Sequence, residues 1–323
     1  MDKYSYALQL PGPLRVLVQC SRPLFDEPQN KLLAGAYIPG IKFAQAQGEH
    51  DLKVSYREGP PLLTVDANGI ELSDSFQGHT VLDLIHLLYS ACRLHWLKRG
   101  LYCVHSACVG APASSKPSAA EAGKPAVCID GLSLIVGHSG SGKTTLALSL
   151  AEQGQKIFSA NKTLLSLGVD GIKAIAGTDT ITRTSSTEAK DQAQAQSKLG
   201  AHPYLGRTAY LLPEEHYLAS EGGKSNLRIT SIALTRLNDG AEEWETLSAI
   251  SALHKLFPFF LDSVNADTVL LQGGAVFSGA LPADQEALVR KTLAAALMSA
   301  LAKVHVVSVC GSRQFITEKL TRR

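Results

Sequence analysis

Hydrophobic and polar residues alternate in several short stretches of the first 75 residues, which is the pattern of half-buried β-strands. The stretches are residues 14–20, 52–56, 61–66 and 67–72. The last two flank Asn68-Gly69, a dipeptide that favours a tight hairpin turn. We find no catalytic motif in this region. We therefore expect a small sheet that acts either as a substrate-selecting domain or as a packing layer.

The hydrophobic pattern changes near residue 79 and then predicts helices interspersed with buried strands. Residues 79–99 present one long apolar face and precede Gly100, which predicts a helix. Further helices are expected at 246–263, with a kink or restart at Pro258, at 284–303, and after Gly311. Strands are expected at 101–109, 124–130, 157–161, 229–234 and 304–310, and a short one within 174–183. The chain is therefore expected to be an α/β protein with a β-rich region at 1–78 and a larger domain at 79–323.

A polar segment of low complexity at residues 185–200 interrupts this pattern. Its composition is typical of a mobile loop or a marginal surface helix. Two interpretations remain open for it: a solvated insertion without a role, or a lid over a site.

Charge and composition exclude several classes of protein. The 323 residues include 31 basic and 29 acidic side chains, a net charge of +2, which is too balanced for nucleic acid or membrane as the main partner. The sequence contains neither a signal-peptide pattern nor an apolar run of about 20 residues. We expect a cytoplasmic protein, and the sequence leaves open a homo-oligomer.

The six cysteines are Cys20, Cys92, Cys103, Cys108, Cys128 and Cys310. They lie mostly in apolar runs and do not form the paired short spacings of a zinc site. On a strand Cys103 and His105 would share a face, but Cys108 would point the other way. We therefore expect buried thiols rather than a metal cluster.

One segment fits the phosphate-binding loop G-x-x-x-x-G-K-[ST] without a mismatch. Its residues are Gly137, His138, Ser139, Gly140, Ser141, Gly142, Lys143 and Thr144, followed by Thr145. A short apolar run precedes it and a helix-forming run follows it, so the backbone N–H groups and the helix N-terminus can hold phosphates. Lys143 is expected to meet the β- and γ-phosphates, and the Thr144 hydroxyl to bind Mg²⁺. The sequence thus predicts a nucleoside triphosphate, with ATP and Mg²⁺ as the cofactors, although it does not decide between ATP and GTP.

Residues 80–320 resemble the HPr kinase/phosphorylase family of P-loop kinases, whose core is similar to that of phosphoenolpyruvate carboxykinase. The matching features are the helix before residue 100, the His105 strand, the phosphate loop, a helix ending at Gly154, and the following strand. The resemblance implies that His105 lies beside the transferred phosphate, although His105 could also be a satisfied strand histidine. The family has two adjacent aspartates after the last of these strands, where this chain has Ala160 and Asn161. Asn161 can still offer one oxygen to Mg²⁺ or its water shell.

A replacement carboxylate is expected at Asp179, in a turn that precedes Arg183. Asp179 could instead be a turn aspartate bonded to its own loop. Arg183 is expected to steady the γ-phosphate, or else to form an exposed salt bridge.

These features predict an ATP-dependent kinase that phosphorylates a hydroxyl of a small molecule or a peptide. HPr itself is a less favoured acceptor because the aspartate pair is altered. The alternative is a nucleotide-binding regulator without phosphoryl transfer, which the missing aspartates favour and the intact loop opposes. An ATPase motor is disfavoured because no acidic strand end of the usual type follows the loop.

Overall fold

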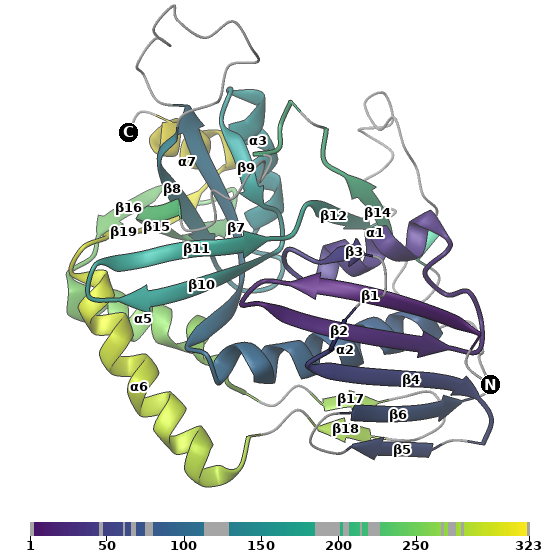
Figure 1. Ribbon diagram of the computed structural model, residues 1–323. Helices are drawn as coiled ribbons and strands as arrows, with labels where there is room; N and C mark the ends of the chain where they lie inside the picture. Colours follow the sequence, from purple (N-terminus) through teal and green to yellow (C-terminus); the bar gives the residue numbers. More distant parts are fainter. Residues whose placement is uncertain are drawn as a thin grey trace, which may run out of the picture. The chain divides into compact units, whose positions relative to one another are not determined.

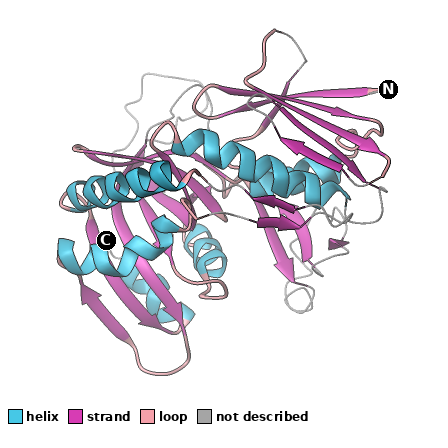
Figure 2. Cartoon of the chain, turned by 90° about the horizontal axis from the view of Figure 1, so that it is seen from below, coloured by secondary structure: helices cyan, strands magenta, loops and turns pink. Residues whose placement is uncertain are grey.

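The computed structural model describes thirteen segments of the chain: residues 3–44, 48–60, 62–65, 69–74, 80–112, 129–184, 201–202, 207–213, 215–218, 227–265, 268–270, 276–278 and 281–321. It is a mixed α/β protein with two mixed β-sheets and, in the described part, six helices (Figure 1). Figure 2 shows the same elements coloured by type. The α/β class predicted from the hydrophobic pattern is confirmed.

The chain forms two compact units, and each is built from three separate segments. The first comprises Met1–Cys103, Thr178–Leu211 and Ser263–Arg290, and the second comprises Val104–Gly177, Leu212–Asp262 and Lys291–Arg323. The sequence predicts a division at residue 78, whereas the helix that follows this position belongs to the same unit as the N-terminal sheet.

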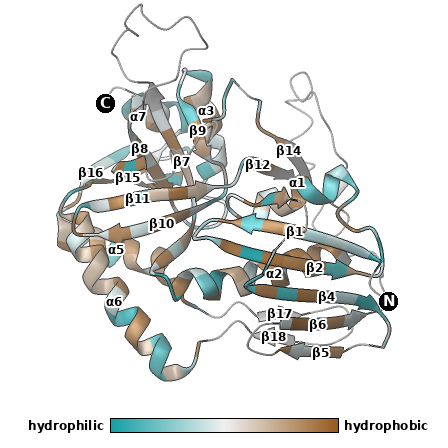
Figure 3. Cartoon of the chain, viewed as in Figure 1, coloured by the Kyte–Doolittle hydropathy of each residue, from teal (hydrophilic) through white to brown (hydrophobic). Residues whose placement is uncertain are grey.

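The first unit contains a six-stranded sheet in the order β3-β1-β2-β4-β6-β5. Its strands are β1 (Tyr4–Leu10), β2 (Leu14–Cys20), β3 (Lys42–Ala44), β4 (Leu52–Glu58), β5 (Leu62–Val65) and β6 (Gly69–Asp74). β5 and β6 form the predicted antiparallel hairpin, with Val65 opposite Ile70. Hydrophobic and hydrophilic residues alternate along strands of this sheet in Figure 3. This pattern predicted β2, β4, β5 and β6, whereas β1 and β3 were not predicted.

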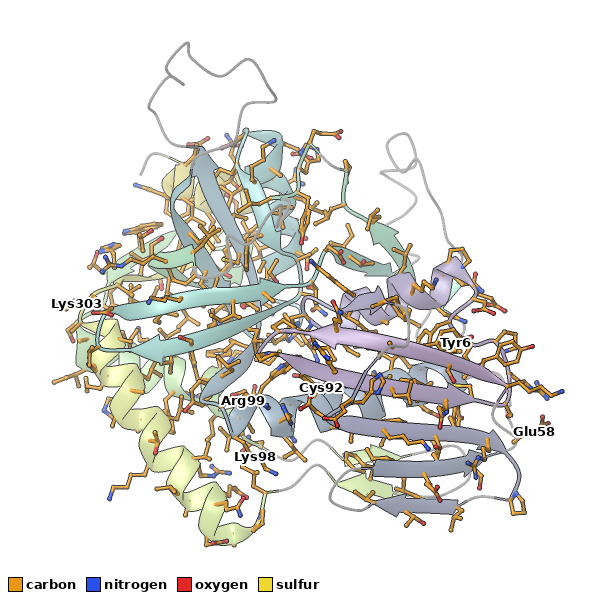
Figure 4. The ribbon with its side chains drawn as sticks, viewed as in Figure 1. Tyr6, Glu58, Cys92, Lys98, Arg99 and Lys303 are labelled. Carbon is orange, nitrogen blue, oxygen red and sulfur yellow. The ribbon has the colours of Figure 1, made fainter. Side chains whose placement is uncertain are left out.

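Two helices accompany this sheet in the first unit. Helix α2 (Thr80–Leu97) is the predicted one, and its apolar face is fully buried at Leu84, Ile85 and Leu88. Cys92, labelled in Figure 4, lies on the same helix and is buried as well. Helix α1 (Pro28–Tyr37) was not expected, because a ten-residue segment that contains Gly35 has too weak a periodic pattern. Helix α1 contacts α2 and two strands of a small sheet, β12 and β14.

The remaining strands of the first unit form two small sheets. One has the order β12-β14-β13, and the other pairs β17 with β18. Their bounds are Thr180–Thr184 for β12, Ala201–His202 for β13, Arg207–Leu211 for β14, Thr268–Leu270 for β17 and Val276–Ser278 for β18. Residues 174–183, where the sequence predicts one short strand, contain the end of β11, which stops at Gly177 in the second unit, and most of β12.

The second unit is built on an eight-stranded sheet with the path β11-β10-β7-β8-β15-β19-β16, and β9 pairs with β7 beside this path. The strands are β7 (Leu101–Pro112), β8 (Ile129–Val136), β9 (Lys156–Ser159), β10 (Lys162–Gly168), β11 (Gly171–Gly177), β15 (Leu227–Leu237), β16 (Glu243–Thr246) and β19 (His305–Gly311). β8, β15 and β19 are parallel, whereas β7 and β16 run antiparallel to their neighbours. Leu132, Leu134 and Val136 of β8 are fully buried, as expected for a central strand.

Four helices belong wholly or partly to this unit: α3 (Lys143–Glu152), α5 (Ala249–Leu261), the C-terminal part of α6 (Ala283–Leu301), and α7 (Arg313–Thr321). Helix α5 runs through Pro258 as one element, and α3 packs against α7. Lys303, labelled in Figure 4, follows α6, and its Cβ lies close to Gly171 at the turn between β10 and β11. No helix in the described segments is long and apolar enough to cross a membrane.

Candidate nucleotide-binding site

The phosphate loop has the order of strand, glycine-rich turn and helix that the sequence predicts. β8 ends at Val136, and α3 begins at Lys143 with Gly142 as its N-terminal cap. Gly140 and Gly142 have φ angles of 78° and 87°, a left-handed conformation that side chains disfavour. Nothing lies within 4 Å of a Cβ built on Gly140, so the tip of the loop faces open space. His138, Ser139 and Thr145 are exposed near this tip.

Lys143 is held on its own loop. Its Nζ donates hydrogen bonds to the carbonyl oxygens of Gly137, at 2.8 Å, and His138, at 2.9 Å. The residue is only 6% exposed, and this burial lowers the pKa of the Lys143 ammonium to about 8. An ammonium group has three N–H donors, so one remains for a ligand when the other two bind the loop.

Thr144 connects the loop to the end of β9. Its Oγ1 donates to the carbonyl oxygen of Ala160 at 3.3 Å, and Ala160 is 1% exposed. Because the hydroxyl proton is used in this bond, the oxygen lone pairs remain for a cation. The structure therefore brings together Thr144 and the segment that carries Ala160 and Asn161.

His105 lies on β7, near the end of the sheet from which the phosphate loop emerges. β7 pairs antiparallel with β8, and the pairing ends with Ser106 opposite Val136, the residue before Gly137. The Ser106 N–H also donates to the Asn161 carbonyl at 3.0 Å. His105 is therefore one residue away from a position that contacts both β8 and Asn161, and it is exposed although its neighbours Val104 and Ser106 are buried.

Asp179 and Arg183 belong to the first unit rather than to the unit of the loop. Asp179 Oδ1 accepts a hydrogen bond from Thr180 Oγ1 at 3.1 Å, and a Cβ on Gly35 of α1 would lie 3.0 Å from the same oxygen. Burial raises the pKa of the Asp179 carboxyl, while the bond from Thr180 lowers it less. A raised pKa is common to catalytic bases and to buried structural carboxylates, so the role of Asp179 stays a prediction.

The backbone of Arg183 lies in β12, but its side chain is outside the described part of the structure, as are residues 185–200. The expected roles of Arg183 as a phosphate ligand and of 185–200 as a lid therefore also stay predictions.

Two residues beside the loop were missed by sequence reasoning. The Leu237 N–H, at the end of β15, donates to the Ser141 carbonyl at 3.2 Å, and its side chain occupies the space that a Cβ on Gly142 would need. Phe259 of α5 contacts His138 with a distance of 4.9 Å between ring centroids and an interplanar angle of 52°. The sequence signal for Phe259 is an aromatic cluster around Pro258, which periodicity alone assigns to the core.

The cysteines and other potential metal ligands form no metal site in the segments that the structure describes. Cys20, Cys92, Cys103 and Cys108 are buried there, and Cys310 is partly buried. Among the described residues, no three histidine, cysteine, aspartate or glutamate side chains gather in a way that could hold a metal ion.

No protein-family model matches the sequence, and no curated protein matches it significantly.

Proposed function

We propose that this protein is an ATP-dependent kinase that transfers the γ-phosphoryl group to a hydroxyl of a small molecule or a peptide. The observation that carries the proposal is the loop itself. Lys143 is fixed by two loop carbonyls with one donor left, and the Thr144 hydroxyl lies against the end of β9. The open space at Gly140 fits a polyphosphate chain, because backbone N–H groups can approach it there without steric hindrance.

The transfer forms a bond from the acceptor oxygen to the γ-phosphorus and breaks the bond to the β–γ bridging oxygen, whose electron pair leaves with ADP. The hydroxyl proton must pass to a base or to the substrate. His105 is suited to a position beside the transferred group, since it is exposed and its strand continues into Ser106, which binds the Asn161 backbone. Phosphoryl transfer depends more on positioning and charge neutralisation than on a strong base, so the absence of the aspartate pair does not exclude it.

Magnesium would supply charge neutralisation between the phosphates, and the chain offers Thr144 Oγ1 and the Asn161 side-chain oxygen to hold it. These two neutral oxygens fit a hydrated Mg²⁺ that arrives with the nucleotide rather than a protein-only site.

The second candidate is a nucleotide-binding regulator that does not transfer phosphate. It is favoured by the neutral end of β9, where Ala160 is buried and the next residue is an amide. Both candidates use the same loop, and they differ only in the fate of the γ-phosphoryl group.

Mass spectrometry of peptide and metabolite pools incubated with the protein, ATP and Mg²⁺ distinguishes the two. A kinase shifts one component by the mass of one phosphoryl group, and Lys143→Ala abolishes that shift and weakens ATP binding more than AMP binding. ATP binding without any shifted component supports the regulator. If Lys143→Ala binds ATP as tightly as the wild type does, the loop does not have the assigned role.

His105→Ala tests the placement of the acceptor. It should lower the transfer rate and leave the Kd for ATP almost unchanged, because His105 is not assigned to the α- or β-phosphate. Transfer at the wild-type rate in this variant would show that the acceptor does not lie beside β7.

A further inference from the structure

The contact between His138 and Phe259 places an aromatic pair at the phosphate loop. His138 is the second residue of the loop and is exposed, whereas Phe259 is half-buried on α5. The groups assigned above to the phosphates are the loop backbone, Lys143 and, through Mg²⁺, Thr144, and the paired rings are not among them.

The strands on the two sides of β8, which carries the loop, bring different kinds of residues to it. On one flank lie β7 and β9, which supply His105 and the carbonyl partner of Thr144. On the other flank the order is β15, β19 and β16, and α5 follows β16 in the chain and packs against β19. Phe259 therefore reaches the loop from an element of the second flank, opposite to the one with the polar groups.

From this arrangement we infer that the His138–Phe259 pair is the stacking surface for the base of the bound nucleotide. The inference rests on the proposed function. If the reactive end of the triphosphate lies toward Thr144 and β9, the chain of phosphates directs the nucleoside to the other flank, where the aromatic pair stands.

Stacking on this pair favours purines. Every base has a π-face, but a purine covers more of an aromatic surface than a pyrimidine does, and one base stacked on one aromatic side chain changes affinity by about tenfold or more. The pair thus adds affinity for the nucleoside to the affinity of the loop for phosphate. Wild-type protein is expected to bind ATP and GTP more tightly than CTP and UTP.

The test compares ATP with inorganic tripolyphosphate, which has the phosphates but no base. Phe259→Ala should weaken ATP binding about tenfold and leave tripolyphosphate binding unchanged, measured by calorimetry with Mg²⁺. Phe257→Ala is the matched control. It removes the same ring from the same helix, but residue 257 lies on a different face of the helix from residue 259. Both ligands should therefore bind as they do to the wild type.

Two further variants keep the result interpretable if Phe259→Ala is poorly folded. Phe259→Tyr preserves the ring and should retain ATP affinity, whereas Phe259→Leu fills the volume without a ring and should lose the preference for purines. Equal ATP affinity in the wild type and in Phe259→Leu would overturn the inference, and so would a parallel loss of tripolyphosphate binding.

Failure of the proposed function gives a separate result. If the wild type does not bind tripolyphosphate, or if Lys143→Ala binds it equally well, the loop is not a phosphate site and the kinase proposal fails with it. If the loop binds tripolyphosphate and only the Phe259 variants behave like the wild type toward ATP, the stacking surface alone is wrong.

Discussion

Lys143 combines burial with a positive charge. An isolated lysine has a higher pKa, so lowering the value to about 8 in the folded state means that the folded protein holds the proton less firmly than the unfolded chain does. Charged Lys143 therefore costs stability below pH 8, and that cost falls as the pH rises from 8 toward the unfolded value. In return, the hydrogen bonds to the two loop carbonyls hold the charged ammonium group in a fixed position.

This shift predicts proton uptake when nucleotide binds. Phosphate oxygens favour the charged ammonium, so ATP affinity should fall as the pH rises above 8, and binding at pH 8.5 should take up a fraction of a proton. Calorimetry in buffers of different ionisation enthalpy measures that uptake. Lys143→Met should show none, and equal uptake in both proteins would assign the proton to another group.

Gly142 must remain a glycine for two separate reasons: its φ of 87° and the Leu237 side chain beside it. Gly154, just beyond α3, has a similar φ of 90°, but nothing lies within 4 Å of a Cβ there. We predict that Gly154→Ala costs about 1–2 kcal/mol of unfolding free energy from backbone strain. Gly142→Ala should cost about 1–3 kcal/mol more, because the methyl group overlaps Leu237.

Chemical denaturation of the two variants measures the difference. Leu237→Ala combined with Gly142→Ala should recover part of the extra loss, since the smaller side chain makes room for the methyl group. Equal destabilisation by the two glycine variants would mean that Leu237 of β15 can move away from the added methyl group at little energetic cost.

At the scale of elements, the proposed Mg²⁺ binding depends on the residues at the end of β9. Ala160 and Asn161 stand where the resembled family has two carboxylates, so Mg²⁺ titrated into nucleotide-free protein should release little heat. Asn161→Asp adds one negative charge beside Thr144 and should strengthen that binding several-fold, since carboxylates are preferred Mg²⁺ ligands. Micromolar Mg²⁺ binding by the wild type without nucleotide would reveal a carboxylate site elsewhere in the chain.

Elements with strong local patterns could be predicted from the sequence. The apolar run of β8 and the glycine motif after it predict a strand followed by a phosphate loop. The long apolar face of α2 predicts a helix from the sequence of that segment alone. α1, β14 and β16 could not be predicted, because they are short and owe their structure to partners distant in the chain. The hydrogen bond of Thr144 to Ala160 and the contact of His138 with Phe259 both join separate elements, and no local pattern encodes their proximity.

At the scale of the whole molecule, the N-terminal 78 residues are part of a larger unit. In that unit α1 contacts α2, β12 and β14, so removing residues 1–78 takes away their partner. Each fully buried leucine or isoleucine of α2 that becomes exposed loses about 1.5–3 kcal/mol.

We therefore predict that the fragment 79–323 does not fold as a separate domain. It should bind a hydrophobic dye and melt without the cooperative transition of the full chain, as differential scanning fluorimetry can show. A fragment with one sharp transition and no dye binding at low temperature would support a domain boundary at residue 78.

Segments of the two units alternate along the sequence, and this alternation determines when each unit can fold during synthesis. The phosphate loop leaves the ribosome about 100 residues before Leu237, and at 5–20 residues per second that interval lasts roughly 5–20 s. Throughout it the loop lacks the strand that packs against Gly142, and the first unit still awaits its last segment, which ends at Arg290. If the protein has the proposed function, a nascent chain should therefore acquire nucleotide affinity only after the strand that carries Leu237 has been synthesised.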